Sequence, residues 1–352
     1  MTARIVQSSS AVCSMLLSIV CIPSTAEPRT RMPLTLTRDG QPASAIVIAA
    51  DASKAAQFAA SDLQWHLKQM TGAEVPIVRD DEDEKVTGTR ILVGESAATV
   101  ALKLKNADFK HQEYLIRFLP DTLILMGRDK DDRGEVKFDP TPSPEAVATW
   151  PSMWDEQGTM YAVYDFLERY CNVRWFNPTE TGADIPRTKT LAVSGTEVRR
   201  APSFRYRYAC YTASEDYDVF TGLWRKDTDG YKSWEAAAYP ELHRRFTDWW
   251  KYVHAKRGFV QLFRYRMREG GELCLGNHSL YGYYDRFWEK GADAKKAELF
   301  EGRKSDWFAQ GYTGRPPQMC YSSRGLIEQV AQDARDFFDG KGTKPGAVAA
   351  GN

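Results

Sequence analysis

The chain has 352 residues, in which 47 Lys and Arg balance 47 Asp and Glu, with 43% hydrophobic and 12% aromatic residues. This length allows about two compact units, and the hydrophobic content is typical of globular domains and excludes a disordered chain. The balanced charge leaves no basic footprint, which argues against a nucleic-acid partner or an anionic membrane surface.

The N-terminus has the pattern of a secretory signal peptide. A basic residue precedes an apolar run over 11–22, and small residues follow at 24–26. We expect export to the periplasm or the extracellular space, with cleavage near Ala26. The run is too short to persist as a membrane-spanning helix. A lipoprotein signal at Cys21 is the weaker alternative, because Val20 is bulky where a small residue is expected.

Removal of this segment would leave four cysteines, namely Cys171, Cys210, Cys274 and Cys320. Their wide spacing contains no C-x-x-C, so we expect no zinc site and no other bound metal. An exported protein can form disulfides. Four unpaired thiols fit the spacing equally well, and the sequence leaves the pairing open.

Residues 45–126 alternate between strand and helix patterns. The expected strands are 44–50, 90–94, 113–118 and 122–126, of which the last two form a hairpin. Asp51 or Ser53 can cap a helix whose apolar residues recur every three or four positions, and Gly72 ends it. The acidic run 79–85 indicates a solvated loop.

Four prolines make 128–157 an expected surface loop. An aromatic helix follows from 158 to 170, with strands at 172–176 and 189–193. The helix could present a platform to a sugar, but aromatic residues at helical spacing favour core packing. These elements complete an expected α/β domain over 27–198.

The remaining residues, 199–352, also alternate between strand and helix patterns. The expected strands are 203–211, 259–265, 272–280 and 317–323, and the expected helices are 241–257 and 325–339. Such alternation is typical of a (β/α) barrel. A complete barrel needs about 250 residues, and only 150 follow Pro202. We therefore expect an α/β fold in which a small α/β domain precedes a partial, truncated TIM-like barrel.

Two sets of motifs resemble known families. "AASDLQWHLKQMTGAEVPIV" (59–78), "ILVGES" (91–96) and the stretch 158–193 resemble the N-terminal domain of bacterial alpha-glucuronidases, a domain type that also precedes the barrel of beta-hexosaminidases. "GNHSLYGYYDRF" (276–287) and the stretch 306–330 resemble an uncharacterised bacterial TIM-barrel family found beside such hydrolases. The resemblance implies a carbohydrate partner.

Asn277 and His278 follow an expected strand, and in a barrel the carboxyl ends of strands carry the site. Both side chains could hydrogen-bond sugar hydroxyls, and the resemblance places His278 in the family's most recognisable short motif. A structural histidine held by a neighbouring carbonyl is an equal alternative.

Arginine and tryptophan supply the other candidate substrate contacts. Arg264 and Arg266 could clamp the carboxylate of a uronic acid, although an ion pair with Glu269 or Glu272 is the simpler interpretation. Trp249 could stack on a pyranose face, with core packing as the alternative.

Catalysis has weaker support than binding. Glycoside hydrolysis needs two carboxyl groups, and neither Glu269 with Glu272 nor Asp216 with Asp218 lies in a supporting motif. The resemblance places the catalytic carboxylates of alpha-glucuronidases on later barrel strands. The sequence contains no dinucleotide, phosphate-loop, nucleophile-elbow or H-E-x-x-H motif, so we expect no cofactor.

Two functions follow. The first is an exported glycoside-hydrolase-like protein that acts on polysaccharide, including one that contains uronic acid, by acid/base hydrolysis, with its catalytic half missing from this chain. The second is a non-catalytic carbohydrate-binding or decayed protein.

Overall fold

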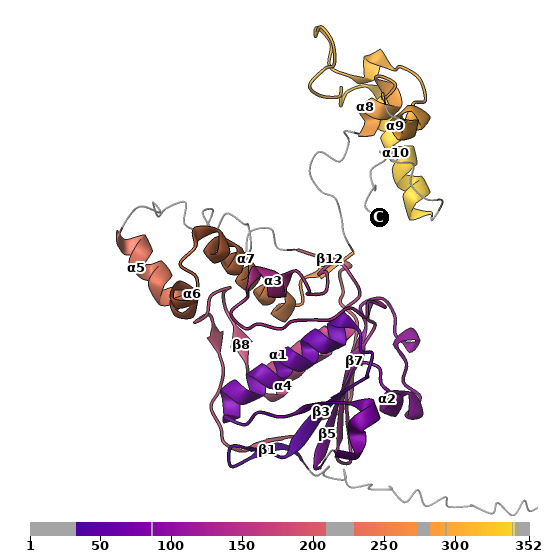
Figure 1. Ribbon diagram of the computed structural model, residues 1–352. Coiled ribbons are helices and arrows are strands. Elements are labelled where there is room, and N and C mark those ends of the chain that lie inside the picture. The colour runs from indigo at the N-terminus through magenta and orange to yellow at the C-terminus, as the bar shows by residue number, and fades with distance from the viewer. Residues whose placement is uncertain are drawn as a thin grey trace, which may run out of the picture.

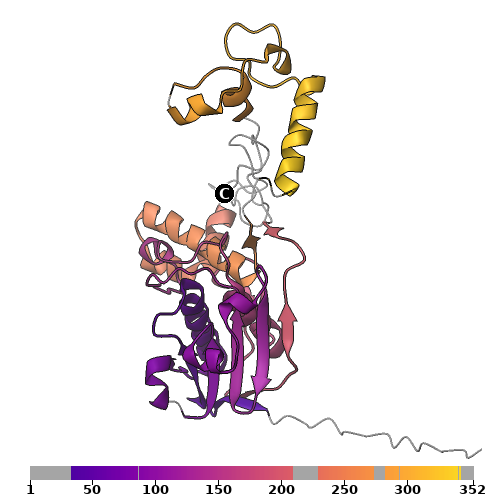
Figure 2. The ribbon, with the colours of Figure 1, turned by 90° about the vertical axis from the view of Figure 1, so that its right-hand side faces the viewer.

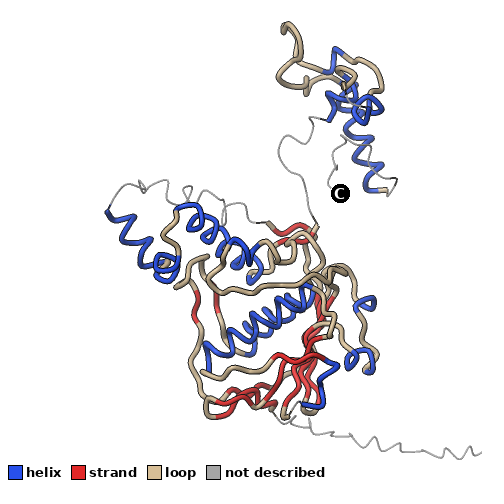
Figure 3. Tube along the Cα trace, in the orientation of Figure 1, coloured by secondary structure: helices blue, strands red, loops and turns tan. Residues whose placement is uncertain are grey.

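The computed structural model describes residues 33–85, 87–208, 229–272, 282–292, 294–339 and 341. The expected signal peptide, Cys210, Cys274, Asp216 and Asp218 lie outside these ranges. Figures 1 and 3 show a layered α/β body and a helical lobe formed by the last described elements.

A six-stranded sheet in the order β11-β6-β7-β5-β3-β4 forms the centre of the body. Its strands are β3 (Ser44–Ile48), β4 (Ile77–Arg79), β5 (Thr89–Val93), β6 (Tyr114–Leu119), β7 (Thr122–Gly127) and β11 (Val198–Arg200). β4, β3, β5 and β7 run parallel, and β6 pairs antiparallel with β7 and with β11. The predicted α/β class and the predicted hairpin are confirmed.

Alternating apolar residues cover both faces of this sheet. On one face they pack beneath α1 (Lys54–Thr71) and α4 (Gly158–Tyr170). On the other they pack beside α2 (Ala97–Ala101). Figure 1 shows α1 and α4 on one side of the sheet and α2 on the other. Burial on both faces is typical of strands in a parallel sheet.

The ends of α1 follow the predicted local chemistry. Of the two candidate caps, Ser53 is the N-cap, and its side chain accepts a hydrogen bond from the Ala56 N–H. Gly72 ends the helix with φ of 79°, a left-handed conformation that glycine adopts without steric cost.

The aromatic helix α4 is a packing element. Tyr161, Tyr164 and Phe166 are buried in the core between α1 and the sheet. The prediction that its aromatic stripe packs rather than presents a sugar platform is confirmed.

Three small sheets complete the body. Their strands are β1 (Leu34–Arg38), β2 (Gln41–Pro42) and β10 (Leu191–Val193) in one sheet, β8 (Arg174–Trp175) and β9 (Ala183–Asp184) in a second, and β12 (Tyr206–Arg207) and β13 (Gly270–Gly271) in a third. Short 3₁₀ turns occupy Asp80–Lys85 and Asn106–Asp108.

The segment 128–157 differs in part from the expected surface loop. It contains only the short helix α3 (Pro144–Val147), but Trp150 and Met153 are buried in the main core. Phe58 meets Trp150 edge to face, with ring centroids 4.9 Å apart. The prolines limit regular structure in this segment, as expected, but the segment is not wholly exposed to solvent, because part of it is buried in the core.

The expected strand at 259–265 is wrong, because these residues belong to the helix α7 (Trp249–Arg266). A short apolar run fits a strand and a buried helix equally well. The expected helix over 241–257 is divided into α6 (Pro240–Arg245) and α7, and the Asp248 side chain caps the second by accepting from the Lys251 N–H. Helix α5 (Asp229–Ala238) precedes both.

Helix α7 packs on the N-terminal layers. Leu262, Phe263 and Tyr265 join the main core, and Figures 1 and 2 both show α7 beyond the α1 and α4 layer. The main core therefore extends past the boundary expected at residue 198.

The last described elements form a separate lobe with its own apolar cluster. They are α8 (Gly282–Phe287), α9 (Ala294–Leu299), a 3₁₀ turn at Ser305–Trp307 and α10 (Arg324–Phe338). Helix α10 confirms the expected helix over 325–339. The expected strand at 317–323 is wrong, because only an isolated bridge joins Phe308 to Met319 there.

The described residues after 208 contain one strand, the two-residue β13, which pairs antiparallel with β12. The expected strand over 203–211 is reduced to β12 within the described residues, and most of 272–280 lies outside them. The parallel strands of the expected partial barrel are therefore absent from the described part of the second region.

In the described part of the chain, no helix combines the length and apolar character needed to cross a membrane. Cys171 and Cys320 are free thiols. Burial raises the pKa of Cys171 to about 12.

Candidate functional site

The structure places Arg266 in a buried polar network. Its guanidinium donates to Asp62 from Nη2 at 2.9 Å and from Nε at 3.2 Å, and Asp62 is fully buried. The Tyr164 hydroxyl donates to the same carboxylate at 3.0 Å. Burial raises the pKa of Asp62, but the charge of Arg266, the neighbouring His66 and the hydrogen bonds from both together outweigh it and hold that pKa well below its usual range.

His66 completes the network from one turn along α1. The Trp175 indole N–H donates to His66 Nε2 at 3.2 Å, so this nitrogen is an acceptor and the proton lies on Nδ1, which faces Asp62. Both rings are shielded from solvent. The contacts of Tyr164, Trp175 and Arg266 with Asp62 and His66 join α4, β8 and α7 to α1. The network is buried and offers no surface to a substrate.

The carboxylate that Arg266 binds is that of Asp62, and not that of Glu269 or Glu272. A role of Arg266 toward substrate stays a prediction. Arg264 lies over the Tyr208 ring at 4.7 Å, and its Nε is 3.9 Å from Glu269.

The other predicted substrate residues are less informative. Asn277 and His278 lie outside the described residues. Trp249 is the first residue of α7, and its side chain lies outside the described part of the structure. Of the four predicted residues, Arg266 alone has a described side chain, so their grouping at one site stays a prediction.

An open hollow of about 720 Å³, named here the arginine hollow, lies between α4 and the edge strand β11. Its volume is in the range of small-ligand sites. It is lined by Tyr114, Tyr161, Asp165, Glu168, Arg169, Tyr170, Arg174, Arg200, Ala201, Pro202, Ser203, Arg207, Met267 and Arg268.

Helix geometry explains the wall formed by α4. Tyr161, Asp165, Glu168 and Arg169 are spaced by four, three and one positions, so their side chains share one face. Arg169 Nε lies 2.8 Å from both carboxylate oxygens of Asp165. Over the second half of the helix, this face lies at the edge of the core and lines the hollow.

Arg207 and Arg268 form the opposite wall. Arg207 donates to the Tyr161 hydroxyl at 2.8 Å and to the Arg268 carbonyl at 2.9 Å. Burial raises the pKa of Tyr161 to about 12, so this phenol stays protonated and can accept from Arg207.

Arg268 is the most unusual residue of the hollow. Its φ of 58° is left-handed, a conformation that costs energy for a residue with a Cβ and that clusters at functional sites. One guanidinium nitrogen contacts Glu168, while the buried Nη1 has no hydrogen-bond partner. A ligand acceptor in the hollow would satisfy that donor.

The charge of the arginine hollow is positive. Five arginines face two carboxylates, an excess of three positive charges. Arg200 is exposed and has no ion-pair partner in the described part of the chain, and Arg174 donates only to backbone carbonyls of Glu168 and Val173. The hollow therefore offers free guanidinium donors to an anion.

Both carboxylates of the hollow already have arginine partners. Asp165 is engaged by Arg169, and Glu168 by Arg268. Hydrolysis of a glycoside would need one carboxyl group free to donate a proton and another free to activate water or attack. The arrangement suits binding of an acidic molecule better than acid/base chemistry.

Sequence reasoning missed the arginine hollow because its residues come from four separate segments. The helical spacing of Tyr161, Asp165 and Glu168 was visible, as was the run of arginines between Arg199 and Arg207. No local pattern indicates that the two lie side by side.

No protein-family model matches the chain, and no curated protein matches it. Among solved structures, a family GH115 4-O-methyl-alpha-glucuronidase with specificity for decorated arabinogalactans is similar at 16% identity with a TM-score of 0.38, over 67% of this chain and 25% of its own. The GH20 beta-N-acetylhexosaminidase of Streptomyces coelicolor A3(2) is similar at 14% identity with a TM-score of 0.29, over 50% of this chain and 25% of its own.

A mutant Streptomyces plicatus beta-hexosaminidase in complex with GlcNAc is similar at 13% identity with a TM-score of 0.28, over 50% of this chain and 24% of its own. The chain thus spans about a quarter of the length of these glycoside hydrolases. The α/β fold follows from the sheet topology, independently of these likenesses.

Proposed function

We propose that the protein is an exported, glycoside-hydrolase-like protein that binds acidic polysaccharide, such as one containing uronic acid, through the arginine hollow. Export rests on the signal-peptide pattern that ends near Ala26. The observation that carries the binding proposal is the set of guanidinium groups in the hollow without a carboxylate partner.

Recognition follows from the chemistry of the walls. A uronate carboxylate accepts paired hydrogen bonds from a planar guanidinium, and Arg200 and Arg174 are the groups available for this contact. The unpartnered Nη1 of Arg268 supplies a further donor to a sugar oxygen.

Binding without turnover by residues 27–352 is the expected behaviour, because Asp165 and Glu168 are both held by arginines. Measurable hydrolysis of an acidic oligosaccharide by this chain alone would overturn that part of the proposal.

The direct test is calorimetric titration with a glucuronic-acid-bearing xylo-oligosaccharide and with the neutral oligosaccharide of the same length. We expect the acidic ligand to bind more tightly, with an affinity that falls as salt is added. Arg200→Ala should weaken the binding about tenfold, as the loss of one exposed charge-assisted contact does.

Arg324→Ala is the matched control, because Arg324 is 92% exposed on α10, outside the arginine hollow. Equal affinity for the acidic and neutral ligands would contradict the proposal. So would an affinity for the acidic ligand that Arg200→Ala leaves unchanged.

A further inference from the structure

The order in which the chain adds parallel strands to the central sheet reverses at one point. From β3 the chain crosses to β4 on one side, and it then returns to β5 and β7 on the other side of β3. In open α/β sheets, ligands bind in the crevice outside the carboxyl ends of the strands where the order reverses. In this sheet that place lies between the ends of β3 and β5.

A hollow of about 730 Å³, named here the switch-point hollow, occupies this place. Its lining follows all four parallel strands: Ala49, Asp51 and Ser53 after β3, Asp80 after β4, Glu95, Ser96, Ala97 and Val100 after β5, and Arg128, Asp129, Lys130, Asp131 and Arg133 after β7, with Lys105, Asn106, Ala107 and Glu156 beside them. It shares no residue with the arginine hollow.

Hydrogen bonds made by side chains join the loops around the switch-point hollow. The Asp80 carboxylate accepts from the Ala50 N–H at 3.0 Å and from the Ala97 N–H at 2.8 Å, which ties the loop after β3 to the loop after β5. Asn106 exchanges two hydrogen bonds with the backbone of Asp129, each 2.8 Å long.

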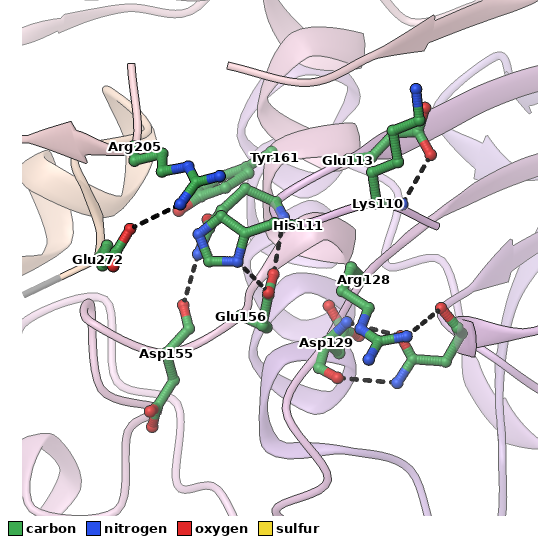
Figure 4. Close-up of polar contacts among 12 residues, drawn as sticks. Lys110, His111, Glu113, Arg128, Asp129, Asp155, Glu156, Tyr161, Arg205 and Glu272 are labelled. Atoms are coloured by element: carbon green, nitrogen blue, oxygen red, sulfur yellow. Dashed lines mark hydrogen bonds and ion pairs between the residues drawn. The ribbon is translucent and has the colours of Figure 1, made fainter. Parts of the chain in front are cut away.

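Figure 4 shows Glu156 turned toward His111 and Arg128 beside Asp129. Glu156 accepts from the Gln112 N–H at 2.7 Å, and Arg128 donates to the Asn106 carbonyl at 3.3 Å. The walls are therefore fixed before any ligand enters, which lowers the entropic cost of binding.

The charge of the switch-point hollow is opposite to that of the arginine hollow. Six carboxylates and four basic groups line it, an excess of two negative charges, which disfavours a phosphate or a uronate. The described residues include no group of three His, Cys, Asp or Glu side chains placed to hold a metal ion. Carboxylate acceptors and basic donors both line the hollow, and a neutral polyhydroxylated molecule satisfies both kinds of group.

We propose that the switch-point hollow binds a neutral mono- or disaccharide. The exposed carboxylate of Glu95 accepts from sugar hydroxyls, and the exposed ammonium of Lys105, which has no ion-pair partner in the described ranges, donates to them. Arg128 supplies further donors from its guanidinium. This site goes beyond the proposed recognition of acidic polysaccharide and has its own ligand class.

Saturation-transfer NMR with D-glucose, D-galactose, D-xylose, L-arabinose and cellobiose tests the proposal, with D-glucuronate and AMP as anionic probes. At least one neutral sugar should bind with millimolar affinity. Glu95→Gln and Lys105→Met should each weaken it by about tenfold or more, as the loss of one hydrogen bond to a charged group does.

Glu74→Gln is the matched control, because Glu74 pairs with Lys68 on the exposed surface beyond the end of α1. Arg200→Ala should also leave neutral-sugar binding unchanged, which separates this site from the arginine hollow. Absence of neutral-sugar binding at tens of millimolar would overturn the proposal. Binding that Glu95→Gln and Lys105→Met leave intact would overturn it as well, and so would AMP or glucuronate displacing the sugar.

Discussion

The layered body and the C-terminal lobe each contain a buried aspartate that accepts from an arginine and from a tyrosine hydroxyl. In the body, Arg266 and the Tyr164 hydroxyl both donate to Asp62. In the lobe, Arg286 and the Tyr283 hydroxyl both donate to Asp333.

The two pairs differ in what they join. The first links residues 204 positions apart within the main core, and the second links two helices of a small cluster across 47 positions. A buried ion pair whose partner is removed leaves an uncompensated charge, and the two pairs are buried to a similar degree. The pair in the body lies in the larger core, which has less freedom to relax around that charge. The pair in the body should therefore matter more to the fold than the pair in the lobe.

The largest expected effect is that of Arg266→Ala. It leaves the fully buried carboxylate of Asp62 without its cation, and should lower the free energy of unfolding by about 3–5 kcal/mol. Urea denaturation followed by tryptophan fluorescence measures this. A loss below about 1 kcal/mol, the value of a surface pair, would remove the distinction between the two regions.

Asp129 sharpens the comparison, because it is a buried carboxylate without an arginine. It accepts from the Thr159 N–H at 2.9 Å and from the Ser53 hydroxyl at 3.1 Å, and burial raises its pKa to about 6. Its folded-state pKa exceeds the unfolded value of 3.8. The resulting stability is thus present below about pH 4 and is lost as the pH rises through 6, in total about 3 kcal/mol.

Asp129→Asn should abolish that contribution, because an amide does not titrate. Thermal denaturation of both proteins across this pH range measures the difference. A wild-type melting temperature that follows the same pH course as that of the variant would contradict the assignment.

The lobe pair should give the smallest effect. Burial works to raise the pKa of Asp333, but hydrogen bonds from Arg286 and Tyr283 outweigh it, so the net shift is downward. Arg286→Ala should cost about 1.5–3 kcal/mol, the value of hydrogen bonds to a charged group.

This loss should be local. Hydrogen exchange should speed up in α8 and α10 while β3, β5 and β7 keep their protection. Faster exchange in the sheet would show that the lobe is coupled to the body more tightly than its separate apolar cluster indicates.

The sequence predicts the body well where the signals are local. Ser53 and Gly72 mark the ends of α1, and the hairpin of β6 and β7 follows from two apolar runs around a turn. These features depend on neighbours in the chain, which a sequence pattern contains.

The sequence fails where distant segments decide the outcome. The run 259–265 is helical because its apolar residues meet the core beside Phe58 and Trp150, a contact that its own pattern does not encode. The arginine hollow likewise depends on α4 meeting Arg200 and Arg268. The predicted partner of Arg266 was a nearby glutamate, whereas the actual partner, Asp62, lies on the first long helix.

The central claim is that the arginine hollow receives an acidic sugar, and a hydrogen-exchange footprint tests it most directly. With a glucuronic-acid-bearing oligosaccharide bound, we expect slower exchange in the second half of α4, in 200–207 and around Arg268, with no change in α10. Protection confined to other segments, or no protection at a ligand concentration that saturates binding, would contradict the account.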